Sequence, residues 1–132
     1  MTATTFTVAT AKDLHARAHQ NGMAALEAAQ VDAMIVGTPT TTLGTDIDFS
    51  KKTYFVEGGV CGFAWVTFPG NTSFGRAMKK AGIARAAYGG GLQVSVHAGG
   101  QSLQRKEAYG YAYADVLVAA GVAKVYCSSR MD

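Results

Sequence analysis

Two of the three histidines in this 132-residue chain have a spacing that could bind a metal ion. His15 and His19 are four residues apart, so both would lie on one side of a helix. No glutamate follows His15, and no third ligand stands nearby in the sequence. We therefore expect two polar residues beside the apolar stripe of a helix, and we assign no metal site.

The third histidine, His97, stands where an expected strand meets a glycine turn and a helix. Backbone N–H groups at such a turn and helix start can hold an anion. The segment lacks the Gly-Lys-Ser/Thr of a phosphate-binding loop and the full dinucleotide fingerprint, so an ordinary glycine turn with a serine cap is the alternative. The candidate anion-binding residues at this turn are Gly99, Gly100, Ser102, Arg105 and Lys106.

A second group of candidates follows from the uneven distribution of charge. Residues 1–65 hold 4 Lys/Arg and 6 Asp/Glu, a net −2, whereas residues 66–132 hold 8 and 3, a net +5. Basic residues near aromatic ones can bind single-stranded nucleic acid by phosphate contacts and stacking. Core aromatics beside a solvated basic face, or an oligomer interface, would give the same composition. The candidates here are Arg76, Lys79 and Lys80.

Signatures of enzymes are weak throughout the chain. It has no nucleophile elbow, no His-Glu-x-x-His and no Cys-x-x-Cys motif. We nominate no catalytic residue and no cofactor, and the sequence favours a protein without catalytic activity. A small enzyme with His97 as acid or base is the weakest alternative. Cys61 and Cys127 stand in apolar runs, and we expect both to be buried, reduced thiols.

The elements that must position these residues can be read from turn signals and periodicity. Helix signals include a capping box formed by Thr10 and Asp13, a Thr72 or Ser73 cap, and a Ser102 cap. Glycines at 82 and 121 are expected to end the second and third helices. The expected strands are residues 31–36, 53–56, 60–68, 92–97 and 125–128, with residues 130–132 as a tail.

Two further expectations concern the strands around Gly58-Gly59. This pair should form a tight hairpin between strands 53–56 and 60–68. The second of these strands is nearly all apolar and should be central and covered on both faces.

Together these signals predict one α+β domain spanning residues 1–132. Its sheet should be mixed or mainly antiparallel, with about four to five strands, and two longer helices and one short helix should pack largely on one face. No apolar run approaches the roughly 18 residues that a membrane span requires, so we expect no membrane partner. The polar, Thr-rich start lacks the features of a secretory signal.

Two segments are possible arms or loops, residues 1–9 and 37–50. The second contains Pro39 and five threonines with few apolar anchors, and loops of such length often serve a function or a partner. Exposed aromatic residues would extend such an interface. The candidate interface residues are Pro39, Thr40, Thr41, Thr42, Leu43, Tyr88 and Tyr111.

Several runs in residues 53–132 carry a likeness to known proteins. They are Cys61-Gly62-Phe63-Ala64-Trp65-Val66, Gly100-Gln101-Ser102 with Arg105-Lys106-Glu107-Ala108-Tyr109, and the terminal Ser129-Arg130-Met131-Asp132. With these runs the chain resembles a group of small proteins encoded by tailed bacteriophages. The resemblance implies a viral origin and transfers no functional residue.

The leading hypothesis is a non-enzymatic phage protein that acts through protein–protein contacts, as an accessory subunit of the virion head or tail. Its partners would be copies of itself or other phage structural proteins, and it would be made in the host cytoplasm before incorporation. The first alternative is an intracellular protein that binds nucleic acid or nucleotides through the basic C-terminal half and acts on host or defence factors. The second is the small enzyme of unknown reaction.

Overall fold

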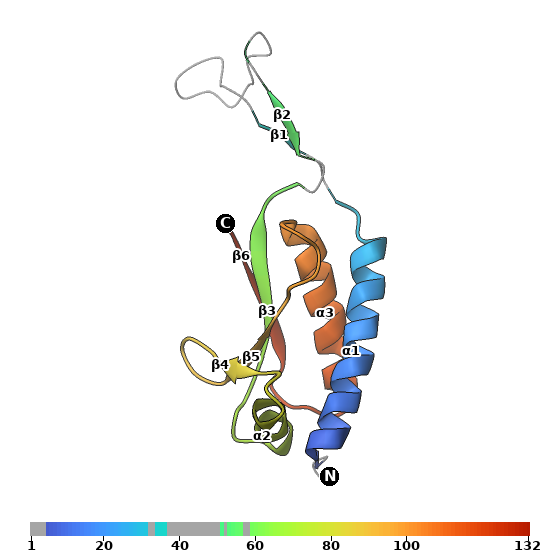
Figure 1. Ribbon diagram of the computed structural model, residues 1–132, viewed down its shortest axis with the longest axis vertical. Helices are drawn as coiled ribbons and strands as arrows, with labels where there is room; N and C mark the ends of the chain where they lie inside the picture. The colour runs from blue at the N-terminus through green and yellow to red at the C-terminus, as the bar shows by residue number, and fades with distance from the viewer. Residues whose placement is uncertain (1–4, 32–33, 37–50, 52, 57–58) are drawn as a thin grey trace.

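The computed structural model describes residues 5–31, 34–36, 51, 53–56 and 59–132. Within them lie three α-helices and six β-strands (Figure 1). In chain order these elements are α1 (Val8–Ala28), β1 (Met34–Val36), β2 (Tyr54–Val56), β3 (Gly62–Phe68), α2 (Ser73–Lys80), β4 (Arg85–Ala86), β5 (Leu92–Ser95), α3 (Leu103–Ala119) and β6 (Tyr126–Met131).

The main sheet has four antiparallel strands in the order β4-β5-β3-β6. Helix α3 packs directly against β3 and β6, and α1 runs along α3, so the long helices lie on one side of the sheet (Figure 1). The short helix α2 contacts α1. The predicted α+β class and the antiparallel sheet are therefore confirmed.

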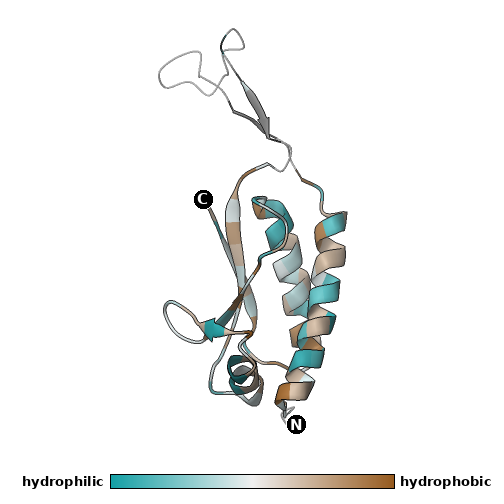
Figure 2. Ribbon diagram, in the orientation of Figure 1, coloured by the Kyte–Doolittle hydropathy of each residue, from teal (hydrophilic) through white to brown (hydrophobic). Residues whose placement is uncertain are grey.

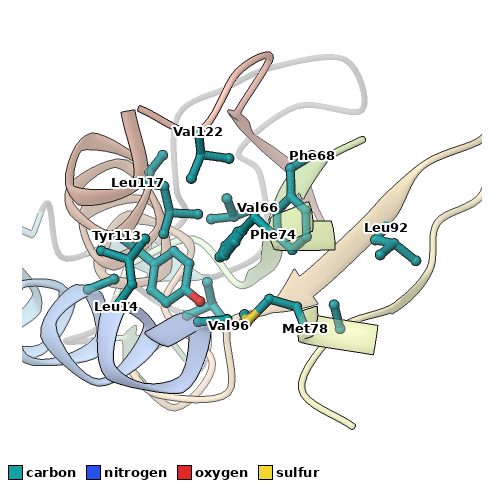
Figure 3. Close-up of a cluster of buried hydrophobic side chains, with 14 of the residues drawn as sticks. Leu14, Val66, Phe68, Phe74, Met78, Leu92, Val96, Tyr113, Leu117 and Val122 are labelled. Atoms are coloured by element: carbon teal, nitrogen blue, oxygen red, sulfur yellow. The ribbon is translucent and has the colours of Figure 1, made fainter. Parts of the chain in front are cut away.

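The core lies between this sheet and the helices. Leu14, Tyr113 and Leu117 from the long helices meet Val66 of β3 and Phe74 of α2 (Figure 3). Around each long helix hydrophilic residues alternate with apolar ones (Figure 2), as expected for a helix with one buried side. Among the described residues, no helix combines the length and apolarity that crossing a bilayer needs.

Strand β3 is central, as predicted, but only one of its faces is fully covered. Ala64, Val66 and Phe68 are buried on the helix side. On the other face Phe63 is 40% exposed and Trp65 is half-buried. The expectation that both faces are covered was wrong, because all three helices are needed to cover the side that holds the core.

The hairpin predicted around Gly58-Gly59 is also wrong. Strand β2 pairs with β1, whereas β3 pairs with β5 on one edge and β6 on the other. With both edges of β3 occupied, β2 has no position beside β3. Gly59 has a positive φ of 72°, the conformation that was expected for a glycine turn. The chain nevertheless continues into β3 without pairing β2 with it.

Helix boundaries follow the capping residues closely. Thr72 and Ser102 cap α2 and α3 as predicted, and Gly82 and Gly121 follow the helix ends with positive φ. Helix α1 begins earlier than predicted, because Thr7 is its N-cap.

The early start of α1 has a simple cause. The Thr7 side chain accepts a hydrogen bond from the Thr10 N–H, and the Thr10 hydroxyl accepts one from the Thr7 N–H. A threonine thus replaces the acidic residue of the usual capping box. Residues 8–9, predicted as part of an arm, are helical, residues 5–7 precede the helix, and residues 1–4 lie outside the described part of the chain.

The last strand is longer than predicted at its C-terminal end. Residues 130 and 131 continue β6 and pair with Phe63 and Gly62. Arg130 and Met131 therefore belong to the sheet, not to a tail. The cause is the length of β3, whose seven residues offer pairing positions beyond Ser128, where the predicted strand ended.

Two glycines let neighbouring elements approach closely. A Cβ atom on Gly110 of α3 would lie 2.5 Å from the Cys127 sulfur of β6, and one on Gly22 of α1 would lie 2.7 Å from the Tyr109 ring. Both distances are shorter than any ordinary contact, so neither position accepts a side chain without a shift. The helix–sheet and helix–helix packing thus depend on these two residues.

We predict that Gly110→Ala destabilises the fold in the native protein and stabilises it when Cys127 is also changed to Ala. In the native background the added methyl collides with the sulfur, and overpacking costs about 1–3 kcal/mol. Without the sulfur, the higher helix propensity of alanine remains, worth about 1 kcal/mol. Urea unfolding of the four proteins in this cycle measures the effect, and additive changes would contradict it.

Candidate functional site

The structure separates the predicted basic residues into two clusters. Arg76 and Lys80 on α2 lie beside residues 5–8, at the start of α1. Arg105 and Lys106 lie beside Gly99 and Leu26, near its end. Helix α1 has 21 residues and is therefore about 30 Å long. The candidates do not form one continuous basic face.

Several backbone donors at the start of α3 have partners within the protein. The Leu103 N–H donates to the Val60 carbonyl, and the Arg105 N–H donates to the Ser102 hydroxyl. The Gly62 N–H donates to the Gln101 carbonyl, which ties this turn to β3. The turn thus forms the cap of α3 and a junction with the sheet.

The two basic side chains of this turn differ in exposure. Lys106 is only 7% exposed, and its Nζ lies 5.3 Å from the centre of the Phe63 ring. Arg130 of β6 lies 5.4 Å from the same ring. Lys106 is thus engaged inside the fold, whereas Arg105 is exposed.

Of the candidate interface residues, two lie in the described part of the chain. Tyr88 is fully exposed in the glycine turn between β4 and β5, and Tyr111 is 54% exposed on α3. Residues 39–43 lie outside the described residues. Cys61 and Cys127 are free thiols but half-buried, not buried as expected.

His15 and His19 each bond a tyrosine of α3. The Nδ1 of His15 lies 2.6 Å from the Tyr113 hydroxyl, and the Nδ1 of His19 lies 2.5 Å from the Tyr109 hydroxyl. Two histidines four apart on α1 thus face two tyrosines four apart on α3. The equal spacing of the two pairs is visible in the sequence. That each histidine bonds a tyrosine follows only from the packing of α1 against α3.

The environment favours the neutral forms of His15, Tyr109 and Tyr113. Burial, with a smaller contribution from His19, lowers the pKa of His15 below its ordinary value of 6.5. Burial raises the pKa of Tyr109, and burial together with Tyr109 raises that of Tyr113. A buried phenol needs an acceptor for its proton, and Nδ1 of the facing imidazole is the recorded partner. Each tyrosine therefore donates to Nδ1, which leaves the imidazole proton on Nε2.

A pocket of about 290 Å³ opens beside these pairs. It lies between α1, α3 and the edge of the sheet formed by β4 and β5. His97, which the sequence singled out, joins His15 and His19 here, although no group of three possible metal ligands is found within the described residues. The pocket is lined by His15, His19, Ile83, Arg85, Gln93, Val94, Ser95, His97, Ala98 and Tyr109.

Strand β6 forms the opposite edge of the sheet. It pairs with β3 on its inner side, and no other described strand pairs with it. Tyr126 is 57% exposed, and Arg130 is also exposed. The register places both on the sheet face that the helices leave open, together with Phe63 and Trp65. An unpaired strand edge thus adjoins a partly open aromatic face.

Comparison with known proteins adds no relative: no family model, curated protein or solved structure matches this chain. The assignment of function therefore depends on the geometry of the sites.

We predict that the free energy of unfolding falls as the pH decreases below about 6.5, and that His15→Gln reduces this fall. The pKa of His15 is lower in the folded state, so the unfolded chain takes up the proton first. The contribution is fully present above pH 6.5 and is lost as the pH falls toward the folded pKa. Urea unfolding at several pH values measures the slope, and an identical slope in both proteins would contradict the assignment.

Proposed function

We propose that this protein is a non-enzymatic assembly subunit that pairs with a second copy of itself through β6. The observation that supports this proposal is the outer edge of β6, which no described strand pairs and whose sequence is complementary to itself in an antiparallel register. Such an interface is isologous, since the same strand contributes from each copy.

The outward-facing groups of β6 follow from its bonds to β3. The Asp132 N–H donates to the Cys61 carbonyl directly opposite, at 3.0 Å. Because alternate residues of a strand point their backbone groups to the same side, residues 126, 128 and 130 also face β3. Cys127, Ser129 and Met131 then direct their N–H and C=O groups to the free edge.

A two-fold axis through Ser128 satisfies these outward groups. In this register Cys127 of one copy faces Ser129 of the other, and the two exchange N–H···O=C bonds. Tyr126 of one copy faces Arg130 of the other, which gives a cation–π contact at each end of the ladder. Cross-strand pairs of this kind contribute roughly 0.2–1 kcal/mol each.

Residues flanking the ladder also match in this register. Val125 faces Met131 of the second copy, an apolar pair. Lys124, which precedes the strand, and Asp132, which follows it, bring opposite charges to the same end of the ladder. The complementarity therefore extends past the paired strands.

The edge lacks the features that usually prevent pairing. Strand edges are commonly protected by proline, by several charged residues or by a bulge. Strand β6 has no proline, its only charged residue is Arg130, and its six residues pair with β3 without interruption. The sequence of β6 therefore favours pairing with another strand.

The hairpin of β1 and β2 offers a second point of contact. Among the described strands they pair with each other and with no third one, and they stand apart from the four-stranded sheet (Figure 1). Both consist of apolar residue types, Met-Ile-Val and Tyr-Phe-Val. Because a lone two-stranded hairpin is marginally stable in water, contact with a partner would favour it.

The resemblance to phage-encoded proteins suggests the setting of this assembly. A symmetric subunit without a catalytic cluster suits an accessory component of a virion head or tail. Mass spectrometry of purified particles of the source phage tests this part, and absence of the chain from particles would limit the proposal to self-association in the infected cell.

We predict that Ser129→Pro converts the assembly to monomers and that Ser129→Ala does not. Proline removes an outward N–H without removing a bond to β3. Both variants lose the 3.0 Å hydrogen bond from the Ser129 hydroxyl to Glu107, so alanine controls for that loss. Light scattering after size-exclusion chromatography gives the mass, and circular dichroism checks that both variants fold. A native protein that is monomeric at high concentration would contradict the proposal.

We also predict that Ser128→Cys forms a disulfide-linked dimer on mild oxidation, whereas Ser95→Cys does not. Ser128 would face itself across the two-fold axis, within the Cα separation that a disulfide requires. Ser95 lies on the same face of the sheet but on β5, away from the edge. Equal yields of crosslinked dimer from the two variants, measured against the native protein, would argue against this register.

A further inference from the structure

We propose that the pocket between α1, α3 and the β4–β5 edge binds a small organic oxyanion. Its carboxylate or phosphate group would lie against Arg85 and the imidazoles, and its apolar part against the wall of Ile83, Val94 and Ala98. The site is independent of β6, which lies on the other edge of the sheet.

The described residues that line the pocket include basic side chains and no acidic ones. Arg85 is exposed at its rim, and no hydrogen bond or ion pair of Arg85 is found within the described residues. None of the described lining residues carries a carboxylate. A guanidinium without a partner among the described residues, in a pocket with three imidazoles, favours an anion, and its fork of N–H groups matches the oxygens of a carboxylate or phosphate.

The histidine–tyrosine pairs make two of the imidazoles fixed donors. Tyr113 and Tyr109 hold His15 and His19 through Nδ1, so each ring keeps its proton on Nε2. The two ring centres are 6.3 Å apart, one helical turn along α1. Because the pairs are held by helix packing, these donors are oriented before any ligand arrives.

Further polar groups enlarge the set of possible contacts. His97 lines the pocket and lies exposed just beyond β5. Gln93 and Ser95 line it at the strand edge, where the register turns their side chains toward the open face of the sheet. The volume of about 290 Å³ is at the small end of the range for ligand pockets. It therefore suits a compact anion with one ring or a short chain, not a polymer.

A titration with inorganic phosphate, phenyl phosphate and benzoate tests this proposal. Isothermal calorimetry and NMR spectra of the imidazole nitrogens would be recorded on the full chain. We expect saturable binding of at least one of the two organic anions, with a shift of the Nε2 resonances of His15 and His19. Preference for phenyl phosphate or for benzoate identifies the oxyanion, and comparison with inorganic phosphate measures the contribution of the apolar wall.

Two matched variants locate the site. Arg85→Gln should weaken binding at least tenfold, and the exposed position of Arg85 should leave the fold intact. Arg76→Gln changes an exposed arginine of α2, beside the first residues of the described chain, and should leave the affinity unchanged.

The proposal would be overturned by either of two results. One is the absence of binding for all three probes at a Kd tighter than about 1 mM. The other is an equal loss of affinity in Arg85→Gln and Arg76→Gln, which would indicate a general attraction of anions to a basic protein. Unchanged Nε2 resonances on saturation would likewise exclude the imidazoles as donors.

Discussion

The arrangement of this protein depends on the fact that β3 has both of its edges occupied. Strand β5 takes one edge and β6 the other, so β3 is paired on both sides. Two consequences follow. Strand β2 cannot pair with β3, the strand that follows it along the chain, and pairs with β1 instead, while β6 becomes an outer strand with one edge that no described strand pairs. Both features on which the proposed assembly rests thus have a single cause.

The two long helices pack closely over one face of the sheet. Gly110 lets α3 lie against Cys127, and Gly22 lets α1 lie against the Tyr109 ring. This close approach brings the hydroxyls of Tyr109 and Tyr113 within hydrogen-bond distance of His19 and His15. The polar pairs that orient the pocket are therefore a product of the same packing that builds the core. The packing of α1 on α3 holds these side chains in place, so losing their geometry would also disturb the contact between the two helices.

Local signals in the sequence predicted the local structure well. Thr72 or Ser73 and Ser102 predicted two helix starts, and Gly82 and Gly121 predicted two helix ends. The order of the elements predicted a mixed or mainly antiparallel sheet. The partner of a strand is not a local property. Gly58-Gly59 indicated a change of direction, but a turn signal does not say whether the next strand pairs with the previous one. The histidine–tyrosine pairs were missed for a related reason, since each half has an ordinary helical spacing and only the packing of α1 on α3 joins them. Likewise, the basic residues of α2 and α3 formed one group along the sequence and two clusters in space.

The central claim is that the outer edge of β6 is paired with a second copy, and amide hydrogen exchange tests it most directly. The N–H groups of Cys127 and Ser129 point away from β3, whereas those of Ser128 and Arg130 point toward it. Exchange would be measured residue by residue at several protein concentrations. The account predicts that Cys127 and Ser129 become slower as the concentration rises, while Ser128 and Arg130 are slow throughout. If Cys127 and Ser129 exchange equally fast at every concentration, β6 is a solvent-exposed edge and the proposed assembly is wrong.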